Sequence, residues 1–341
     1  MNQIFDKRLV FITGKGGVGK TTITAALGYL AASYGKKVLL CELESRGNLA
    51  SAFSLDKIGY TPQKVIDNLY VMSMDTAQSL AEYVHLTLKL PNFGRLGPLN
   101  SIFELFSVAA PGVREILSVG KLCYEIHENH YDLVIADASA TGHVIGMLTS
   151  SKDITDMVDT GVIHDQTGWM DDILYDPNQT CISLVTTAHE TPVLETLDLA
   201  DRLLGSLNIG LGPIFANMVM GEIFNRREAD FFAALSTPYM TEVLLKEVNE
   251  NAKSSAADKK YIARQLAEVL FVSDLAMGIR REEEAQLLRL ASGLSALKAG
   301  MNQTSSLPDI LYLPYLFNRS DLFSVTKEIA ANLSDELSVG M

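Results

Sequence analysis

The chain has 341 residues, a length that suits one large α/β domain or two small ones. Hydrophobic residues make up 48% of it and charged residues 20%, which excludes a disordered, collagen-like or low-complexity chain. The 28 Lys and Arg residues against 41 Asp and Glu leave a net charge of −13. This acidic balance argues against nucleic acid as a main partner, because such binders need clustered positive charge.

The cysteines and the apolar runs indicate the compartment. Cys41, Cys123 and Cys181 occur singly, so we expect reduced, buried thiols rather than a disulfide scaffold or a structural zinc site. The early apolar run Leu9–Ile12 breaks at once into Gly and Lys, unlike a secretory signal. No stretch approaches the roughly 18 consecutive apolar residues of a membrane span. The sequence therefore predicts a soluble, cytoplasmic protein.

Short β-branched runs alternate with longer helical patterns along the chain, which is typical of an α/β fold with a doubly wound, mostly parallel sheet. The helical pattern Lys20–Tyr34 joins the first two runs into one βαβ unit. In chain order, the predicted strands are Arg8–Thr13, Lys37–Glu42, Leu69–Ser73, Asp132–Asp137, Thr180–Thr186, Gly212–Val219 and Ile310–Leu313.

Two long spans, at about 76–129 and 222–297, are mainly helical in pattern. The second contains the apolar run Val269–Val272, which could instead be a further short strand. The sheet resumes after each span, so the chain is hard to divide into independent folding units. We therefore expect a single domain over residues 1–341 with an inserted helical subdomain.

A phosphate-binding loop follows the first predicted strand. Residues 14–22 read G-K-G-G-V-G-K-T-T and fit the pattern G-x-x-x-x-G-K-[ST] between a strand and a helix. Glycines let the backbone N–H groups point inward, and the helix N-terminus adds positive potential. Lys20 would bridge the β- and γ-phosphates of a nucleotide, and the Thr21 hydroxyl would ligate Mg²⁺. The predicted nucleotide-binding residues here are Gly16, Gly17, Val18, Gly19, Lys20, Thr21 and Thr22.

Two carboxylates follow predicted strands beside this loop. Glu44 comes just after the second strand, where it could hold Mg²⁺ through water or orient an attacking water. Asp137 ends an apolar strand, as in sites where the aspartate faces Mg²⁺ through water. The sequence thus predicts a P-loop nucleotide hydrolase.

Lys15, one residue after the first glycine of the loop, is not needed by an ordinary phosphate loop. The wider pattern K-G-G-V-G-K-T-T resembles the deviant Walker A ATPases, among them the MinD, ParA, nitrogenase iron-protein and arsenite-pump proteins. That resemblance implies that Lys15 acts across a nucleotide-sandwich dimer, as a counterpart to an arginine finger.

A narrower resemblance comes from D-A-S-A-T-G-H at 137–143. This segment is similar to the D-T-A-P-T-G-H switch II of the ArsA-type family, which includes arsenite-pump ATPases and eukaryotic tail-anchored-protein targeting ATPases. Phe215–Asn217 resembles that family's V-V-N strand end, which implies that Asn217 reads adenine. Leu313–Leu316 resembles its late loop, which implies that Pro314 flanks the adenine ring. ATP and Mg²⁺ are the implied cofactors.

The chain also departs from that family. Glu44-Ser45 stands where the family has Asp-Pro, so the water-orienting carboxylate is one methylene longer and slow hydrolysis is plausible. The zinc-binding CxxC of the eukaryotic dimer interface and an obvious arsenite-binding cysteine set are absent from the sequence.

The resemblance implies a Mg²⁺-dependent ATPase with Lys15, Lys20 and Glu44 as catalytic residues. It would form a homodimer, or a heterodimer with a related ATPase subunit. ATP-driven closure would be coupled to a client protein or partner, with a membrane involved only indirectly. Two alternatives stay open: the energising subunit of an anion or metalloid pump, and a weakly hydrolysing structural partner of a related subunit. The apolar stretch Ile102–Ala110 is either core or a groove for a hydrophobic client.

Overall fold

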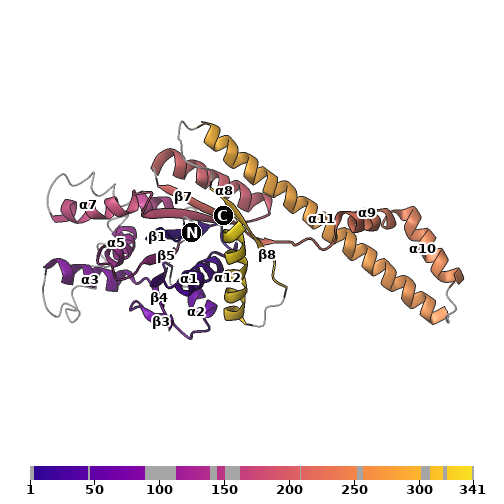
Figure 1. Ribbon diagram of the computed structural model, residues 1–341, viewed down its shortest axis with the longest axis horizontal. Coiled ribbons are helices and arrows are strands. Elements are labelled where there is room, and N and C mark those ends of the chain that lie inside the picture. Colours follow the sequence, from indigo (N-terminus) through magenta and orange to yellow (C-terminus); the bar gives the residue numbers. More distant parts are fainter. Residues whose placement is uncertain are drawn as a thin grey trace.

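The computed structural model describes residues 4–44, 47–88, 113–138, 144–149, 162–207, 209–251, 256–300, 308–317 and 321–339 (Figure 1). These residues form an α/β fold around one eight-stranded sheet with the order β3-β4-β2-β5-β1-β6-β7-β8. The strands are β1 (Leu9–Gly14), β2 (Val38–Glu42), β3 (Gln63–Ile66), β4 (Leu69–Ser73), β5 (Leu133–Asp137), β6 (Thr180–Thr187), β7 (Gly210–Val219) and β8 (Ile310–Pro314).

The sheet is parallel except at one edge, as expected for strands joined by helical crossovers. The exception is β3, which pairs antiparallel with β4 and which the sequence pattern did not predict. Its side chains at Gln63 and Lys64 are exposed, so the segment lacks the apolar run by which the other strands were found. Asn68 turns the chain into β4 with a φ of 63°.

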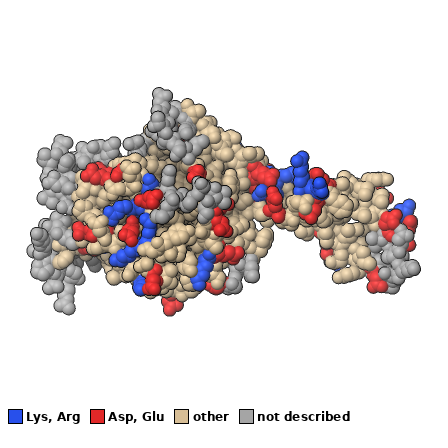
Figure 2. All heavy atoms as spheres, viewed as in Figure 1, with Lys and Arg blue, Asp and Glu red and all other residues tan. Residues whose placement is uncertain are grey.

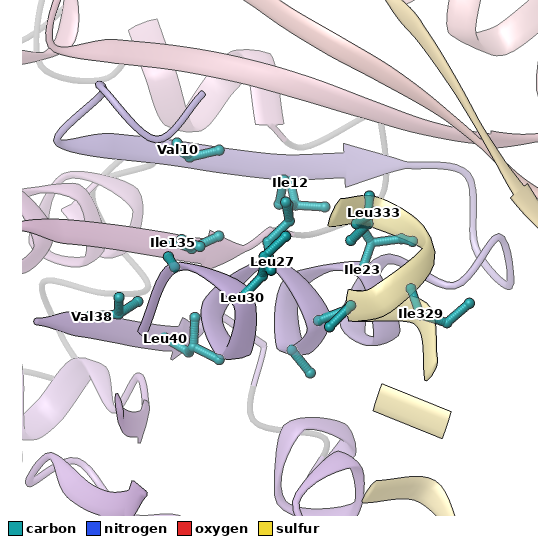
Figure 3. Close-up of a cluster of buried hydrophobic side chains, with 14 of the residues drawn as sticks. Val10, Ile12, Ile23, Leu27, Leu30, Val38, Leu40, Ile135, Ile329 and Leu333 are labelled. Atoms are coloured by element: carbon teal, nitrogen blue, oxygen red, sulfur yellow. The ribbon is translucent and has the colours of Figure 1, made fainter. Parts of the chain in front are cut away.

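One face of the sheet is covered by α1 (Lys20–Ser33), α2 (Asn48–Ala52) and α12 (Leu322–Val339). Val10 and Ile12 of β1 point to this face and pack against Ile23 and Leu27 of α1, as Figure 3 shows. Beyond α1, Ile329 and Leu333 of α12 complete the same core. The last helix of the chain therefore packs directly on the helix that follows the phosphate loop.

The opposite face is covered by α5 (Val113–His127), α7 (Val162–Leu174) and α8 (Glu190–Arg202), and α3 (Thr76–Leu88) packs against α5. Leu9 and Phe11 of β1 point to this side, which follows from the two-residue period of a strand. A short π-helical segment, η2 (Leu203–Leu207), continues α8. The cysteines are buried and free, as predicted.

An arm extends from the body and consists of α9 (Arg226–Leu235), α10 (Pro238–Asn251) and the first part of α11 (Ala256–Gly300) (Figure 1). The 45-residue α11 continues into the body, where it packs on α8. The run Val269–Val272 lies inside α11, so the suggestion of a further strand is wrong: the flanking sequence continues the helix without Gly or Pro for a turn on each side. Among the described helices, none is long and apolar enough to cross a bilayer.

Several predicted features lie outside the described residues, namely Ile102–Ala110, most of the switch II segment after Ala138, and Ser45. The division of the chain into a single domain stays a prediction.

Candidate functional site

The phosphate loop joins the end of β1 to the start of α1. Gly19 is the residue before α1 and has a left-handed φ of 93°. Within this described stretch, no side chain caps the helix and the first turn holds no acidic residue. The first N–H groups of α1 therefore lack a side-chain acceptor, and the positive end of the helix dipole is uncompensated. This arrangement suits a bound anion.

Asn217, near the end of β7, forms a hydrogen bond to the backbone of the phosphate loop. Its Nδ2 donates to the carbonyl oxygen of Val18 at 2.8 Å, and the residue is only 4% exposed. A Cβ added at Gly19 would lie 2.3 Å from that nitrogen, so the close approach requires glycine. The implied role of Asn217 in reading adenine stays a prediction, and the observed contact gives this amide a structural role at the loop.

Lys20 lies over the loop. Its Nζ donates to the carbonyl oxygens of Gly14 at 3.1 Å and Lys15 at 3.2 Å. The side chain faces a cavity of about 500 Å³ at the carboxyl ends of the central strands, a volume typical of small-molecule sites. The predicted residues that line it are Gly16, Gly17, Gly19, Lys20, Thr21, Thr22, Glu44 and Asp137.

Thr21 and Asp137 meet at the floor of this cavity, where the Thr21 hydroxyl donates to Asp137 Oδ2 at 2.5 Å. Burial is the main reason that the pKa of Asp137 rises to about 6. The Thr21 hydrogen bond and Lys20 oppose the rise, and Glu42 and Glu44 add to it. Asp137 Oδ1 is buried and has no hydrogen-bond partner among the described residues. A hydroxyl and an unsatisfied carboxylate oxygen in one place fit Mg²⁺, which takes oxygen ligands and keeps several waters.

Magnesium at this place would need oxygens from a nucleotide as well. The described part of the chain contains no cluster of three or more His, Cys, Asp or Glu side chains that could hold a metal ion alone. Mg²⁺ is commonly held by one or two protein oxygens plus substrate phosphates, and the Thr21–Asp137 pair matches that pattern.

Glu42 is a site residue that the sequence reasoning missed. It pairs in register with Asp137 across β2 and β5, lines the cavity and is 2% exposed. Its carboxylate accepts from the backbone N–H groups of Gly47 (3.1 Å), Asn48 (2.9 Å) and Leu49 (3.4 Å). It therefore positions Gly47–Leu49, at the start of α2 (Asn48–Ala52). The signal was available, because Glu42 ends a predicted strand two residues before Glu44.

The outer wall of the cavity comes from α2 and α12, which sequence reasoning also did not predict. Leu322, Val325 and Thr326 of α12 line the same cavity as the phosphate loop. Thr326 Oγ1 donates to the carbonyl oxygen of Ala52 in α2 at 3.1 Å, which ties the two helices together. Residues separated by most of the chain thus enclose one site.

Lys15 forms an ion pair inside the chain. Its Nζ lies 2.7 Å from Glu195 Oε1 on α8, and the two side chains are 35% and 38% exposed. The action of Lys15 across a dimer stays a prediction, and this pair shows where the lysine lies in one chain.

Pro314 lines a second cavity of about 560 Å³, between the ends of β7 and β8 and helix α11. Val219 and Tyr312 share its sheet side, and Leu287 and Leu288 its helix side. The lining is largely apolar, which is compatible with a flat ring. The structure thus places the phosphate-loop residues and Pro314 at two separate cavities.

Comparison with known proteins finds similarity mainly in the first half of the chain. Residues 7–167 match the model of a family described as anion-transporting ATPases. The "ATPase BagA" of Mycobacterium tuberculosis is 32% identical over 221 residues, which cover 62% of this chain and 64% of that protein.

An "ATPase ASNA1 homolog" of Entamoeba dispar is 32% identical over 158 residues, covering 44% of this chain and 48% of that protein. An "ATPase ASNA1 homolog 2" of Paramecium tetraurelia is 35% identical over 144 residues, covering 41% and 42%. The chain thus spans less than two thirds of the length of each of these relatives.

Proposed function

We propose that the chain is an ATPase of the ArsA type that binds ATP with Mg²⁺ and hydrolyses it; the match of residues 7–167 to that family's model and the cavity geometry support this. One observation carries the proposal. The uncapped first turn of α1 opens on a cavity that also holds a lysine, a threonine hydroxyl and an unsatisfied aspartate oxygen. Each group has a part in phosphoryl transfer, where catalysis rests on positioning and charge stabilisation.

The residues divide this work by position. The loop N–H groups and the Lys20 ammonium would bind the β- and γ-phosphate oxygens. In doing so, Lys20 would exchange its present contacts with two loop carbonyls for contacts with phosphate. Thr21 and Asp137 would hold Mg²⁺, directly and through water, and that ion would neutralise charge on the phosphates. Glu44 would orient the attacking water, because it lines the same cavity beyond the end of β2.

Glu42 would act on hydrolysis through Glu44. Its carboxylate holds the backbone N–H groups of Gly47, Asn48 and Leu49, so it would restrain the segment that carries Glu44 from its far end. Glu44 is longer than the aspartate of the resembled family, and a firmly held backbone would limit the extra freedom of that longer side chain.

The active form would be a dimer in which Lys15 reaches the nucleotide of the other subunit. Support comes from the position of Lys15 at the rim of the loop and from its partly exposed ion pair with Glu195, which costs little to exchange for a phosphate. Closure of the two subunits would then be coupled to a client protein or partner.

The alternative of a metalloid pump subunit finds little support in the described cysteines. All three are buried, and burial raises the pKa of each thiol, to about 12 for Cys181. Protonated thiols on separate strands and helices do not form a thiolate cluster.

Single-turnover hydrolysis tests the proposal. The chain is mixed with trace labelled ATP, with Mg²⁺ or with excess EDTA, over a range of protein concentrations. We expect Mg²⁺-dependent release of phosphate. In a second series at saturating ATP, the rate per chain should rise with protein concentration, as a dimer requires. Tight ATP binding without any release would favour the structural-partner alternative, which is then tested by adding a related ATPase subunit.

A further inference from the structure

The strand that contacts the phosphate loop is also held, at its end, by the arm helix α11. Met220 is the first residue after β7, and both of its backbone groups bind charged side chains of α11. Its N–H donates to Glu283 Oε2 at 2.8 Å, and Arg280 Nη1 donates to its carbonyl oxygen, also at 2.8 Å. We call this pair of bonds the Met220 clamp. Figure 2 shows charged side chains of both signs gathered where the arm leaves the body.

The Met220 clamp is well placed to resist movement. Hydrogen bonds that involve a charged group are stronger than those between neutral groups. The carboxylate of Glu283 belongs to a residue only 5% exposed, so little water competes for it. Arg280 and Glu283 are three positions apart, on one side of the helix. Val219 and Leu287 share a buried cluster beside them. The end of β7 is therefore fixed to α11 by polar and apolar contacts.

A β-bulge lies just before the Met220 clamp. Ala216 pairs with Tyr312 and Val219 pairs with Pro314, so β7 takes three steps where β8 takes two. Met218 lies within this irregularity and has a φ of 58°, a left-handed value that a methionine rarely adopts. A bulge of this kind changes the direction in which the neighbouring side chains point.

The bulge connects the clamp to the phosphate loop. A left-handed backbone at a residue other than glycine persists only where the surrounding contacts fix it. On one side of Met218, Asn217 binds the carbonyl oxygen of Val18, and on the other side Met220 is clamped. Successive side chains of a regular strand alternate between its two faces. A return of Met218 to ordinary strand conformation would therefore turn the Asn217 amide away from Val18.

We propose that Arg280 and Glu283 are positioning residues for nucleotide binding. They hold Met220, the held Met220 preserves the bulge, and the bulge keeps Asn217 on the backbone of the phosphate loop. The inference rests on the proposed function, because it concerns the same phosphate-binding loop. Glu283 lines neither the phosphate-loop cavity nor the cavity at Pro314, so it acts on a bound nucleotide through Met220 and not by contact.

Calorimetric titration of the full chain with ATP and with tripolyphosphate, both with Mg²⁺, tests the proposal. Tripolyphosphate has no base, so it reports on the phosphate loop alone. We expect Glu283→Ala to raise the dissociation constants of both ligands about tenfold, the equivalent of one net hydrogen bond. Turnover at saturating ATP should stay within about threefold of the unaltered chain, since the groups that surround the γ-phosphate are unchanged.

Three further variants separate positioning from a general loss of structure. Glu283→Gln keeps an acceptor oxygen of the same reach and should restore both dissociation constants to within about threefold. Glu282→Ala alters the exposed neighbour on the same helix and is the matched control, which should change nothing. In a chain that already carries Asn217→Ala, the Glu283→Ala change should cause no further loss of affinity, because its effect passes through that amide.

Arg280→Ala removes the other bond of the clamp and gives a second measurement if Glu283→Ala does not fold. It should raise the dissociation constant of tripolyphosphate by a similar factor, with Arg281→Ala as its control.

The outcomes distinguish this inference from the proposed function. An unaltered chain that binds neither ligand would overturn the proposed function, and this inference with it. If the unaltered chain binds both ligands and the clamp variants bind them equally well, only this inference is wrong. A loss confined to ATP, or a full further loss in the Asn217→Ala chain, would also overturn it, because the effect would then not pass through the phosphate loop.

Discussion

Lys15 and Glu195 are 180 positions apart and form an ion pair of 2.7 Å within one chain. The pair joins the phosphate loop to the first half of α8. Both side chains are more than a third exposed, so solvent screens the attraction and the pair contributes no more than about 1 kcal/mol. It can hold Lys15 in place in a single chain and still yield to a more strongly charged phosphate.

We predict that Glu195→Gln frees Lys15 and raises turnover at low protein concentration, by up to about fivefold, the equivalent of 1 kcal/mol. Steady-state hydrolysis at several protein concentrations measures the effect. Asp198→Asn, which removes an exposed carboxylate from the same helix, is the control. A Glu195→Gln rate equal to that of the control would mean that the pair does not restrain Lys15.

Lys15→Ala should leave ATP binding largely intact and lower turnover by at least about 10³-fold, the scale of a cation supplied across an interface to the γ-phosphate. Mixing gives the sharper test. Lys15→Ala protein can bind ATP, and Lys20→Ala protein can supply an intact Lys15. Hydrolysis that returns when these two inactive proteins are combined would require action across subunits, whereas a mixture that stays inactive would argue for action within one chain.

Lys20→Ala should abolish ATP binding, because it removes the cation that contacts the carbonyl oxygens of Gly14 and Lys15 at the loop. Isothermal titration calorimetry with Mg²⁺ and ATP measures this directly. Lys57→Ala, at an exposed position away from the cavity, should bind as the unaltered chain does. Unchanged affinity in the Lys20 variant would contradict the assignment of the loop.

The free energy of unfolding should depend on pH through Asp137. Its pKa is about 6 in the folded chain against a usual 3.8, so the folded state binds the proton more tightly. The favourable contribution is complete below pH 3.8 and is lost as the pH rises through 6, with a total on the order of 3 kcal/mol. Asp137→Asn removes this dependence.

Denaturant unfolding in EDTA at pH 5 and pH 7.5 measures the difference between the two proteins. We expect Asp137→Asn to gain stability relative to the unaltered chain as the pH rises. Parallel pH profiles for the two proteins would contradict the elevated pKa. Added Mg²⁺ and ATP should reverse the gap, because a bound cation favours the ionised carboxylate.

Substitutions at Glu42 and at Glu44 should differ in their effects: the first should lower both stability and turnover, and the second only turnover. Glu42→Ala leaves three backbone N–H groups without their acceptor, so it should lower both the free energy of unfolding, by about 2–3 kcal/mol, and the hydrolysis rate. Glu44→Gln should lower only the rate. Thermal unfolding and single-turnover hydrolysis of both variants decide the matter. Equal stability losses in the two would show that Glu44 is also a structural group.

The parts of the site that the sequence predicted are those encoded locally. Lys20, Thr21 and the loop glycines occur within nine consecutive residues, and Asp137 ends an apolar strand that was predicted for the same parallel sheet; the structure pairs that strand with β1. The carboxyl ends of parallel strands meet at one edge, so these groups had to converge.

The parts that were missed depend on long-range packing. No local pattern predicts the hydrogen bond from Thr326 to Ala52 or the ion pair between Glu195 and Lys15. The edge strand β3 is short and exposed, and its partner rather than its composition makes it a strand. The same limit explains Val269–Val272, whose apolar run is ambiguous until the helix around it is seen.

Because α11 belongs to both the arm and the body, a movement of the body helix that it packs against would also move the arm. Near Gly293, where an added Cβ would lie 2.7 Å from the Leu197 side chain, α11 is pressed closely against α8, the helix that carries Glu195. From Gly293 to the outer end of the helix is a lever of about 55 Å. A tilt of α8 by about 5° would swing that end by roughly 5 Å. A change at the phosphate loop that tilted α8 through Glu195 would therefore produce a larger displacement at the outer end of α11.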